Sequence, residues 1–193
     1  MSVDPRLVAA FQRQLAQRRG ERVGWKVGAG EAERIGETLS VGHLTSETLL
    51  DPGATYDTRG ARLHVDAEVA VVIGDGYTAA LELVDLGNEG TGAENVVATN
   101  IFHRAVAFGP ARRELPPGLT ARLLVNGEVR VEGTVTNVLD RIREAAAVLA
   151  AAGERLEPGD RIITGSVVQV PVQSGDEVTA DFGPLGSVTV RLA

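Results

Sequence analysis

Between Leu63 and Asp85 the sequence contains two strongly apolar segments that are interrupted by acids and predict two β-strands joined by a short turn. Successive side chains of a strand point to opposite faces, so Asp66 and Glu68 share one face of the first predicted strand. In the second predicted strand, Glu82 lies between two leucines. A carboxylate on an otherwise apolar strand costs several kcal/mol if it is buried without a partner. The three acids therefore need cations or a solvated cleft.

Two interpretations of these acids are open. A hard divalent metal held by oxygen ligands would supply the missing positive charge. Alternatively, all three acids face solvent on one side of an antiparallel sheet, which is common for alternating strands.

The rest of the pattern predicts few helices and many short strands. Helices are predicted at 5–19 and 137–152, a helix leading into a strand at 96–108, a hairpin at 123–131, and further strands at 23–27, 160–165, 167–172, 177–182 and 187–192. For the helix at 137–152 we expect Asn137 as the N-cap and Gly153 as the stop. Because strands dominate and helices do not alternate with them, we expect a single α+β domain over residues 1–193. Residues 1–20 would form an N-terminal helix packed on it.

Composition limits the classes of function. The chain has 193 residues and 44% hydrophobic content, enough for one sizeable core. Its net charge of −7 and its lack of a basic tract argue against a nucleic-acid partner and against an anionic membrane surface. Without cysteine it forms neither disulfides nor a thiolate metal site. No apolar run reaches the length of a membrane span and no signal-peptide core is present, so we expect a cytoplasmic protein.

Lys26 is the sole lysine among 19 basic residues, the others being arginine. A lysine offers a compact charge that can act as an acid, a base or an anion stabiliser, which a guanidinium does less well. We favour a functional role for Lys26 over chance survival at a strand edge. For His103, either a site residue or an ordinary partly buried histidine, we favour the ordinary interpretation.

Four segments carry a family resemblance. They are Gly24-Trp25-Lys26-Val27-Gly28, Asp66-Ala67-Glu68-Val69-Ala70, Ala80-Leu81-Glu82-Leu83-Val84-Asp85, and a C-terminal stretch that begins at Thr164-Gly165-Ser166. In their order and joint occurrence they resemble the fumarylacetoacetate hydrolase superfamily, specifically its branch of 2-keto-4-pentenoate hydratases and 4-oxalocrotonate decarboxylases. The resemblance covers the chain from about Leu7 onward.

This resemblance implies a fold and a metal. The fold would be a mixed β-roll or sandwich of the fumarylacetoacetate hydrolase C-terminal-domain type, with few flanking helices. Asp66, Glu68 and Glu82 would hold one Mg²⁺ or Mn²⁺. Family members also associate, so a homo-oligomer is expected, and a complex with a paralogous enzyme stays open.

The resemblance further implies a lyase that acts on a small 2-oxo or 2-hydroxydienoic acid. The substrate would chelate the metal, which would stabilise an enolate during hydration or decarboxylation. Lys26 would act near the substrate oxygen together with Glu68 and Glu82 as catalytic residues. The substrate-binding residues would be Leu44, Asn100 and Ser166.

Three departures from the branch keep other functions open. Asp66 stands where the branch usually has a glutamate, Thr99-Asn100 stands where it has Asp-Asn, and the segment between the acidic strands, 75–79, is short. One alternative is a C–C hydrolase of acylpyruvates, in which His103 or Glu94 would activate water. The other is a catalytically degenerate member that serves as a binding or partner subunit.

Overall fold

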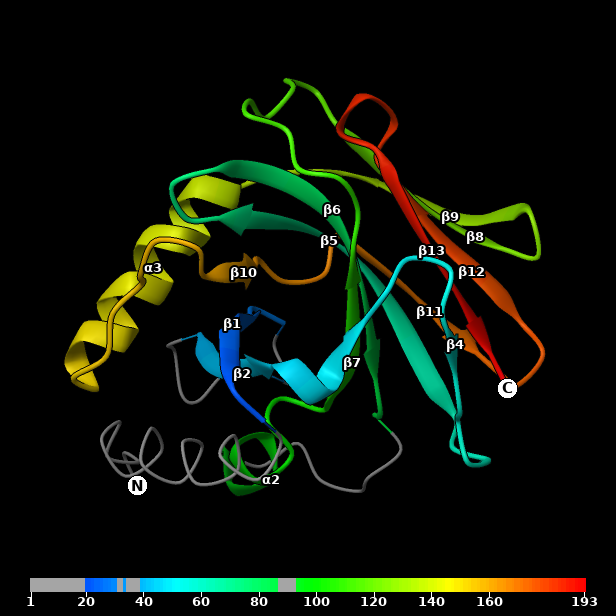
Figure 1. Cartoon of the computed structure of the whole chain (residues 1–193), viewed down its shortest axis with the longest axis horizontal. Helices are drawn as coiled ribbons and strands as arrows, with labels where there is room; N and C mark the ends of the chain where they lie inside the picture. Colours follow the sequence, from blue (N-terminus) through cyan, green and yellow to red (C-terminus); the bar gives the residue numbers. More distant parts are fainter. Residues whose placement is uncertain (1–19, 31–32, 34–38, 87–92) are drawn as a thin grey trace.

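The computed structural model describes residues 20–30, 33, 39–86 and 93–193 (Figure 1). Strands predominate in this part of the chain, and together with two α-helices they form a mixed α+β fold, as the alternating pattern predicts. The helix predicted at 5–19 lies outside the described residues. No helix within the described ranges is long and apolar enough to cross a membrane.

Two sheets make up the fold. The helices are α2 (Ala93–Ala98) and α3 (Val138–Ala151), with 3₁₀ turns η2 (Ser46–Thr48) and η3 (Gly183–Leu185); the strands are β1 (Arg22–Gly28), β2 (Ser40–Thr45), β3 (Leu49–Leu50), β4 (Thr55–Tyr56), β5 (Leu63–Val72), β6 (Gly76–Val84), β7 (His103–Phe108), β8 (Thr120–Val125), β9 (Glu128–Thr134), β10 (Arg161–Ile163), β11 (Val168–Val172), β12 (Glu177–Asp181) and β13 (Ser187–Leu192). The larger sheet has eight strands, in the order β2-β1-β10-β5-β6-β7-β3, with β11 also paired to β5. The smaller has five, in the order β4-β13-β12-β8-β9.

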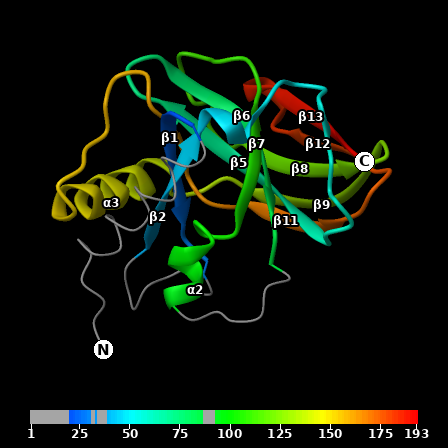
Figure 2. The same ribbon diagram turned by 60° about the horizontal axis from the view of Figure 1, so that its bottom comes forward.

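The main apolar core lies between the β5–β6 hairpin and the five-stranded sheet. Val65, Ala67 and Val69 of β5 are buried there together with Phe182 and Val190. These β5 residues occupy alternate positions, so one face of the strand is entirely apolar. Figures 1 and 2 show the five-stranded sheet on one side of β5 and β6, and α3 on the far side of the molecule. The opposite face of the hairpin, which carries Asp66, Glu68 and Glu82, does not pack on the five-stranded sheet.

Strand β1 is held in place from the face that carries Trp25, which is buried in an apolar cluster with Ala145 and Leu149 of α3. Asp160 accepts hydrogen bonds from Arg22 Nη1 at 2.7 Å and from Trp25 Nε1 at 2.9 Å. The Arg22 guanidinium also lies 4.5 Å from the centre of the Trp25 ring, a cation–π distance. Gly24 lets β1 approach β10 closely, since a Cβ at this position would lie 1.8 Å from the Arg161 carbonyl oxygen. These contacts fix the strand that carries Lys26, whose side chain points to the other face.

Two local expectations need correction or completion. Helix α3 begins and ends near the predicted residues, and Gly153 follows it with a φ of +75°. Asn137 precedes the helix, but its side chain does not cap it: the backbone there is left-handed (φ +59°), whereas a capping residue is normally extended. The helix leading into a strand at 96–108 is confirmed by α2 and β7.

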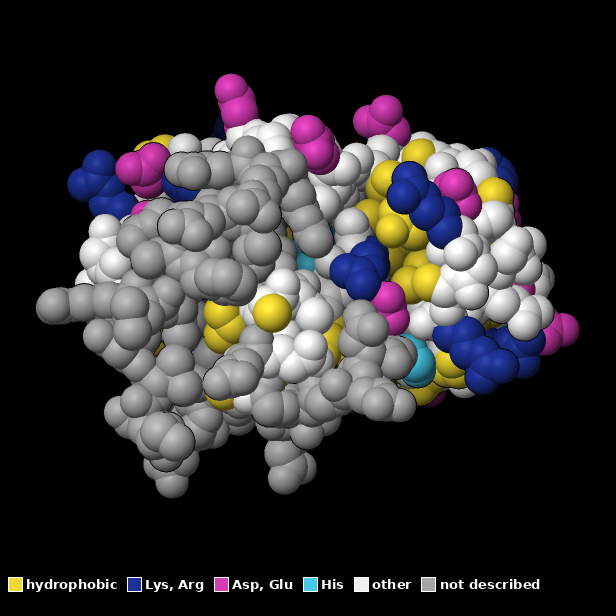
Figure 3. Space-filling view, turned by 90° about the horizontal axis from the view of Figure 1, so that it is seen from below, with side chains coloured by type: hydrophobic (Ala, Val, Ile, Leu, Met, Phe, Trp, Pro, Cys, Tyr) yellow, Lys and Arg dark blue, Asp and Glu magenta, His cyan; other side chains and the backbone are white. Residues whose placement is uncertain are grey.

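On the face seen in Figure 3, acidic and basic side chains of the described residues are intermixed around small hydrophobic areas.

Candidate metal centre

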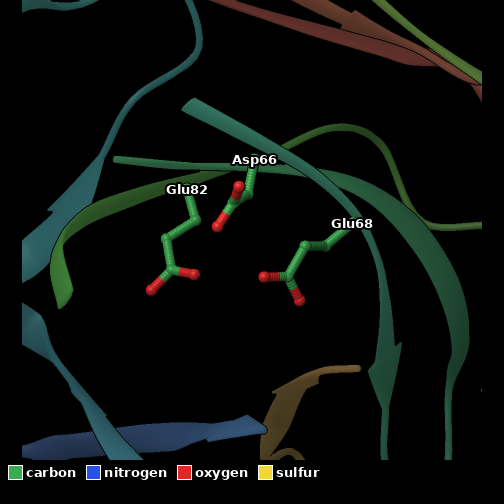
Figure 4. A group of neighbouring side chains, drawn as sticks. All are labelled: Asp66, Glu68 and Glu82. Carbon is green, nitrogen blue, oxygen red and sulfur yellow. The ribbon is translucent and has the colours of Figure 1, made fainter. Parts of the chain in front are cut away.

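The antiparallel register of β5 and β6 brings the three acids together. Asp66 and Glu82 are directly opposite each other, and Glu68 lies two residues further along the same face of β5. Figure 4 shows the three side chains leaving the hairpin on one side with their carboxylates turned toward a common space. One oxygen of each carboxylate lies within 4.8 Å of the other two. All three residues are at most 1% exposed, so the solvent-facing interpretation of the sequence pattern is wrong.

Asp66 and Glu68 are oriented by the segment between β10 and β11 and by β11 itself. Asp66 Oδ1 accepts hydrogen bonds from Ser166 Oγ at 3.1 Å and from Gln169 Nε2 at 2.7 Å. Glu68 Oε2 accepts one from the backbone N–H of Gly165 at 2.6 Å. Both acids are thus fixed from one side by residues about a hundred positions later in the chain.

Glu82 is held by a nitrogen at each of its oxygens. Lys26 Nζ lies 2.8 Å from Oε2, and His103 Nδ1 lies 2.7 Å from Oε1. The other ring nitrogen of His103 lies 3.0 Å from Thr48 Oγ1, whose hydroxyl is also 3.0 Å from the Thr45 carbonyl oxygen. His103 is fully buried. The histidine is therefore more buried than the ordinary interpretation expects, and it contacts a candidate metal ligand directly; a functional role for it stays a prediction.

Burial and the neighbouring charges give the three acids different pKa values. Burial, reinforced by the charge of Glu82, raises the pKa of Asp66 to about 7 against the opposing effect of Lys26. Burial and Glu82 also raise the pKa of Glu68 well above its usual value. For Glu82 burial acts in the same direction, but Lys26 and His103 outweigh it and lower the pKa. Glu82 is therefore the acid that stays ionised when no other cation is present.

Lys26 is the cation that faces the cluster. Burial alone lowers the pKa of Lys26, yet the neighbouring carboxylates, Glu82 first, raise it above its usual value. Glu33 Oε1, which lies outside the triad, is 3.9 Å from the same ammonium group. A buried ammonium that stays charged serves as a proton donor or anion stabiliser and not as a base.

The donor set fits a hard divalent cation. Carboxylate oxygens are the ligands that Mg²⁺ and Mn²⁺ prefer, and nitrogen or sulfur ligands are not needed. When all three carboxylates are ionised, the Lys26 ammonium does not neutralise them, and a divalent cation would supply the missing positive charge. Asp66, Glu68 and Glu82 can therefore hold Mg²⁺ or Mn²⁺.

The other residues expected to bind substrate lie at different distances from the triad. Ser166 contacts Asp66 directly. Leu44 is fully buried in an apolar cluster with Ala70 and Ala80. Ala70 comes two residues after Glu68 on β5, and Ala80 pairs with Glu68 from β6. The side-chain amide of Asn100 forms two hydrogen bonds with the backbone of His43 in β2. Its Oδ1 accepts from the His43 N–H at 2.9 Å, and its Nδ2 donates to the His43 carbonyl oxygen at 2.8 Å. Its amide is thus engaged by the protein itself.

Two residues near the site were not singled out in the sequence. Gln169 pairs directly with Asp66 across β5 and β11, and its one sequence signal is a polar residue inside the apolar run Val167–Val172. Glu33 approaches Lys26 from a turn closed by its hydrogen bond to the Gly30 carbonyl at 3.0 Å. Nothing in the local sequence of Glu33 indicates that position.

Comparison with known proteins identifies the family. The fumarylacetoacetate (FAA) hydrolase C-terminal family matches residues 31–193. The chain belongs to this family. Among curated proteins none matches the chain.

Solved structures of the family extend the comparison. With 26% identity, the chain is similar to 4-oxalocrotonate decarboxylase from Pseudomonas putida G7 in complex with magnesium and adipate, at a TM-score of 0.82 over 94% of this chain and 82% of the other. Fumarylpyruvate hydrolase from Pseudomonas aeruginosa, in complex with Mn²⁺ and pyruvate, has a TM-score of 0.66 with 16% identity over 90% of each chain. A 5-carboxymethyl-2-hydroxymuconate delta-isomerase from Mycobacterium smegmatis has a TM-score of 0.63 with 19% identity, over 89% of this chain and 78% of the other. The last two similarities show the fold alone.

Proposed function

We propose that this family member is a divalent-metal-dependent lyase, a decarboxylase or hydratase, that acts on a small 2-oxo or 2-hydroxydienoic acid. The observation that carries the proposal is the buried triad of Asp66, Glu68 and Glu82 with the Lys26 ammonium 2.8 Å from Glu82. Its similarity to a decarboxylase that binds magnesium and a dicarboxylate supports this class of chemistry. The geometry serves both lyase reactions equally.

Each residue has a definite part in this proposal. A bound Mg²⁺ or Mn²⁺ supplies Lewis-acid stabilisation of the negative charge that develops on the C2 oxygen of a 2-oxo acid. Asp66, Glu68 and Glu82 hold that ion. Lys26 donates a hydrogen bond or a proton to the developing charge, because its ammonium stays charged in this surrounding. Exclusion of water from the site strengthens both interactions.

The hydrolase alternative has less support. It needs a group that activates water. Both ring nitrogens of His103 are taken up by Glu82 and Thr48, and the side chain of Glu94, the other candidate, lies outside the part of the chain that the structure describes. The partner-subunit alternative predicts an intact fold without metal binding. Self-association, a complex with a paralogous enzyme and a cytoplasmic location stay predictions.

Calorimetric titration with Mg²⁺ and Mn²⁺, each with and without oxalate, tests the proposal. Oxalate mimics the chelating enolate of a 2-oxo acid, so no substrate has to be guessed. We expect binding that oxalate enhances, that Glu82→Gln abolishes and that Glu128→Gln, a change at an exposed strand residue, leaves intact. If the wild-type protein binds neither ion, the lyase proposal is wrong and the partner-subunit function is favoured.

A second stage tests the reaction itself. Unsaturated 2-oxo acids are offered to the metal-loaded protein, with decarboxylation followed by released CO₂ and hydration by loss of the conjugated chromophore. We expect turnover that Lys26→Ala abolishes while metal binding persists. Turnover retained in Lys26→Ala would contradict the role given to this lysine.

A further inference from the structure

The segment that joins β10 to β11 orients two of the three acids. Gly165 donates its backbone N–H to Glu68 Oε2 at 2.6 Å, and Ser166 donates its hydroxyl to Asp66 Oδ1 at 3.1 Å. Thr164 fixes the beginning of the segment on β5, since its backbone N–H and its hydroxyl both bind the Val69 carbonyl oxygen, at 3.1 and 2.9 Å. The next peptide group joins Thr164 to Gly165 and carries the N–H that binds Glu68. A rotation of this group would therefore move or break its hydrogen bond to Glu68.

That peptide group is also held from its other side, by Arg141 of α3. Arg141 Nη1 donates to the Thr164 carbonyl oxygen at 2.8 Å and to the Gly165 carbonyl oxygen at 3.1 Å. The Thr164 carbonyl and the Gly165 N–H belong to one peptide unit and point in opposite directions from it. The guanidinium, the peptide and the Glu68 carboxylate thus form one line of hydrogen bonds in which each polarises the next.

The packing around Gly165 leaves little freedom for another arrangement. Its φ of +90° is a left-handed conformation that favours glycine, and a Cβ there would lie 3.0 Å from Arg141 Nη1 and 3.1 Å from the Ala29 Cβ. Arg141 therefore fills the space beside the peptide as well as bonding to it. A shorter or uncharged side chain would leave both a gap and two carbonyl groups without their donor.

We propose that Arg141 is a positioning residue for the metal centre. It holds the Thr164–Gly165 peptide so that the Gly165 N–H points at Glu68, and it thereby couples helix α3 to the orientation of this ligand. The inference rests on the metal-binding part of the proposed function. The competing explanation is that Arg141 merely attaches α3 to the sheet.

Helix α3 offers a matched control two residues further on. Arg143 has a side chain that is 73% exposed and pairs with Asp140 on the same helix. Arg141→Gln and Arg143→Gln thus remove the same charge from the same helix, and only the first touches the segment that orients the acids. Arg141→Lys keeps a charge and a donor but lacks the planar guanidinium.

The experiment compares Mn²⁺ binding by calorimetry, the electron paramagnetic resonance spectrum of bound Mn²⁺, and thermal unfolding in EDTA for the wild type and the three variants. We expect Arg141→Gln to weaken Mn²⁺ binding by about 10–100-fold, the usual effect of removing a group that orients a metal ligand. Its Mn²⁺ spectrum should change, Arg141→Lys should recover part of the affinity, and Arg143→Gln should match the wild type.

A purely structural role would give a different result. It would lower the unfolding temperature in EDTA and leave the Mn²⁺ affinity and spectrum of the folded protein unchanged, which would overturn the proposal. If Arg141→Gln does not fold, Arg141→Lys decides: a wild-type affinity and spectrum refute the proposal, and a weakened affinity supports it. Absence of Mn²⁺ binding by the wild type would instead refute the proposed function.

Discussion

The two faces of the β5–β6 hairpin are equally buried and chemically opposite. Val65, Ala67 and Val69 pack on the five-stranded sheet, whereas Asp66 and Glu68, on the same strand, point to a space closed by β1, β7 and the segment after β10. All five residues are at most 1% exposed. Burial therefore does not tell the two faces apart. What differs is the set of donors and cations that each face meets.

This difference shows how the hairpin accommodates three acids in its interior. On the apolar face, packing alone contributes to stability. On the acidic face, Lys26, His103, Gln169 and the Gly165 N–H offset part of the desolvation of the carboxylates. A metal ion would offset the rest by favouring the ionised form of Asp66 and Glu68. The acidic face is therefore stabilised less by packing than the apolar face, and it carries the candidate metal ligands.

The strongest way to break the comparison is to place an acid on the apolar face. Ala67 is fully buried between Val168 and Leu81, which pair with it from the neighbouring strands. Ala67→Asp should lower the free energy of unfolding by on the order of 5 kcal/mol, because the side chain would enter an apolar core cluster. Urea unfolding followed by circular dichroism measures it. A midpoint equal to that of the wild type would show that the apolar face tolerates charge.

The next largest effect should come from pH. Asp66 binds its proton more tightly in the folded protein, with a pKa of about 7 against an ordinary 3.8, so the metal-free fold binds more protons than the unfolded chain between these values. The free energy of unfolding should therefore fall as the pH rises from about 4 to about 7, by up to about 4 kcal/mol at about 1.4 kcal/mol per pKa unit. Glu68 acts in the same direction.

Metal ions should oppose this loss of stability at higher pH. Mg²⁺ binds the ionised acids, so the rise in unfolding temperature that it produces should grow between pH 5 and pH 8. Urea titrations at several pH values, in EDTA and in Mg²⁺, measure both trends. Asp66→Asn is the control, because its side chain cannot ionise; it should reduce the pH dependence in EDTA to the part that Glu68 contributes. A wild-type stability that rises with pH over this window in EDTA would contradict the prediction.

Breaking the ion pair on the acidic face should have an intermediate effect. Glu82→Gln leaves the Lys26 ammonium, which is 1% exposed, without its nearest counter-charge, and should lower the free energy of unfolding by about 3 kcal/mol. The double variant Lys26→Met, Glu82→Gln removes the stranded charge and should recover most of this loss without restoring metal binding. Chemical unfolding of the three proteins in EDTA gives the comparison. A double variant less stable than Glu82→Gln would count against it.

The sequence alone predicts the acidic face but not what stabilises it. Alternation places Asp66 and Glu68 together, and the short connection 73–75 between β5 and β6 sets a register that puts Glu82 opposite Asp66. Lys26 reaches the same space only because β1 pairs with β10 and β10 with β5, a sheet order that local pattern does not contain. Its position as the sole lysine was the usable signal.

His103 shows why the remainder could not be predicted. It is the first residue of β7, and the register with β6 shifts between Leu83 and Val84 beside it, so the face to which it points does not follow from alternation. The direction of the Asn100 side chain does not follow from alternation either. Its φ of +55° lies outside regular helix and strand values, and its amide binds the β2 backbone. Long-range contacts of single polar side chains depend on the completed fold.

The smallest effect that we predict sharpens the comparison at His103. His103→Leu removes the group that contacts Glu82 and should weaken Mn²⁺ binding by about 10-fold. His103→Asn keeps a donor near the position of Nδ1 and should weaken the binding less. Thr48→Val removes only the hydroxyl beside Nε2 and should cost about 1 kcal/mol in stability, with a still smaller loss of affinity. Calorimetry with Mn²⁺ and unfolding in EDTA separate the two quantities. Equal affinities for His103→Asn and His103→Leu would mean that the hydrogen bond to Glu82 does not orient the ligand, and that His103 only fills space on the acidic face.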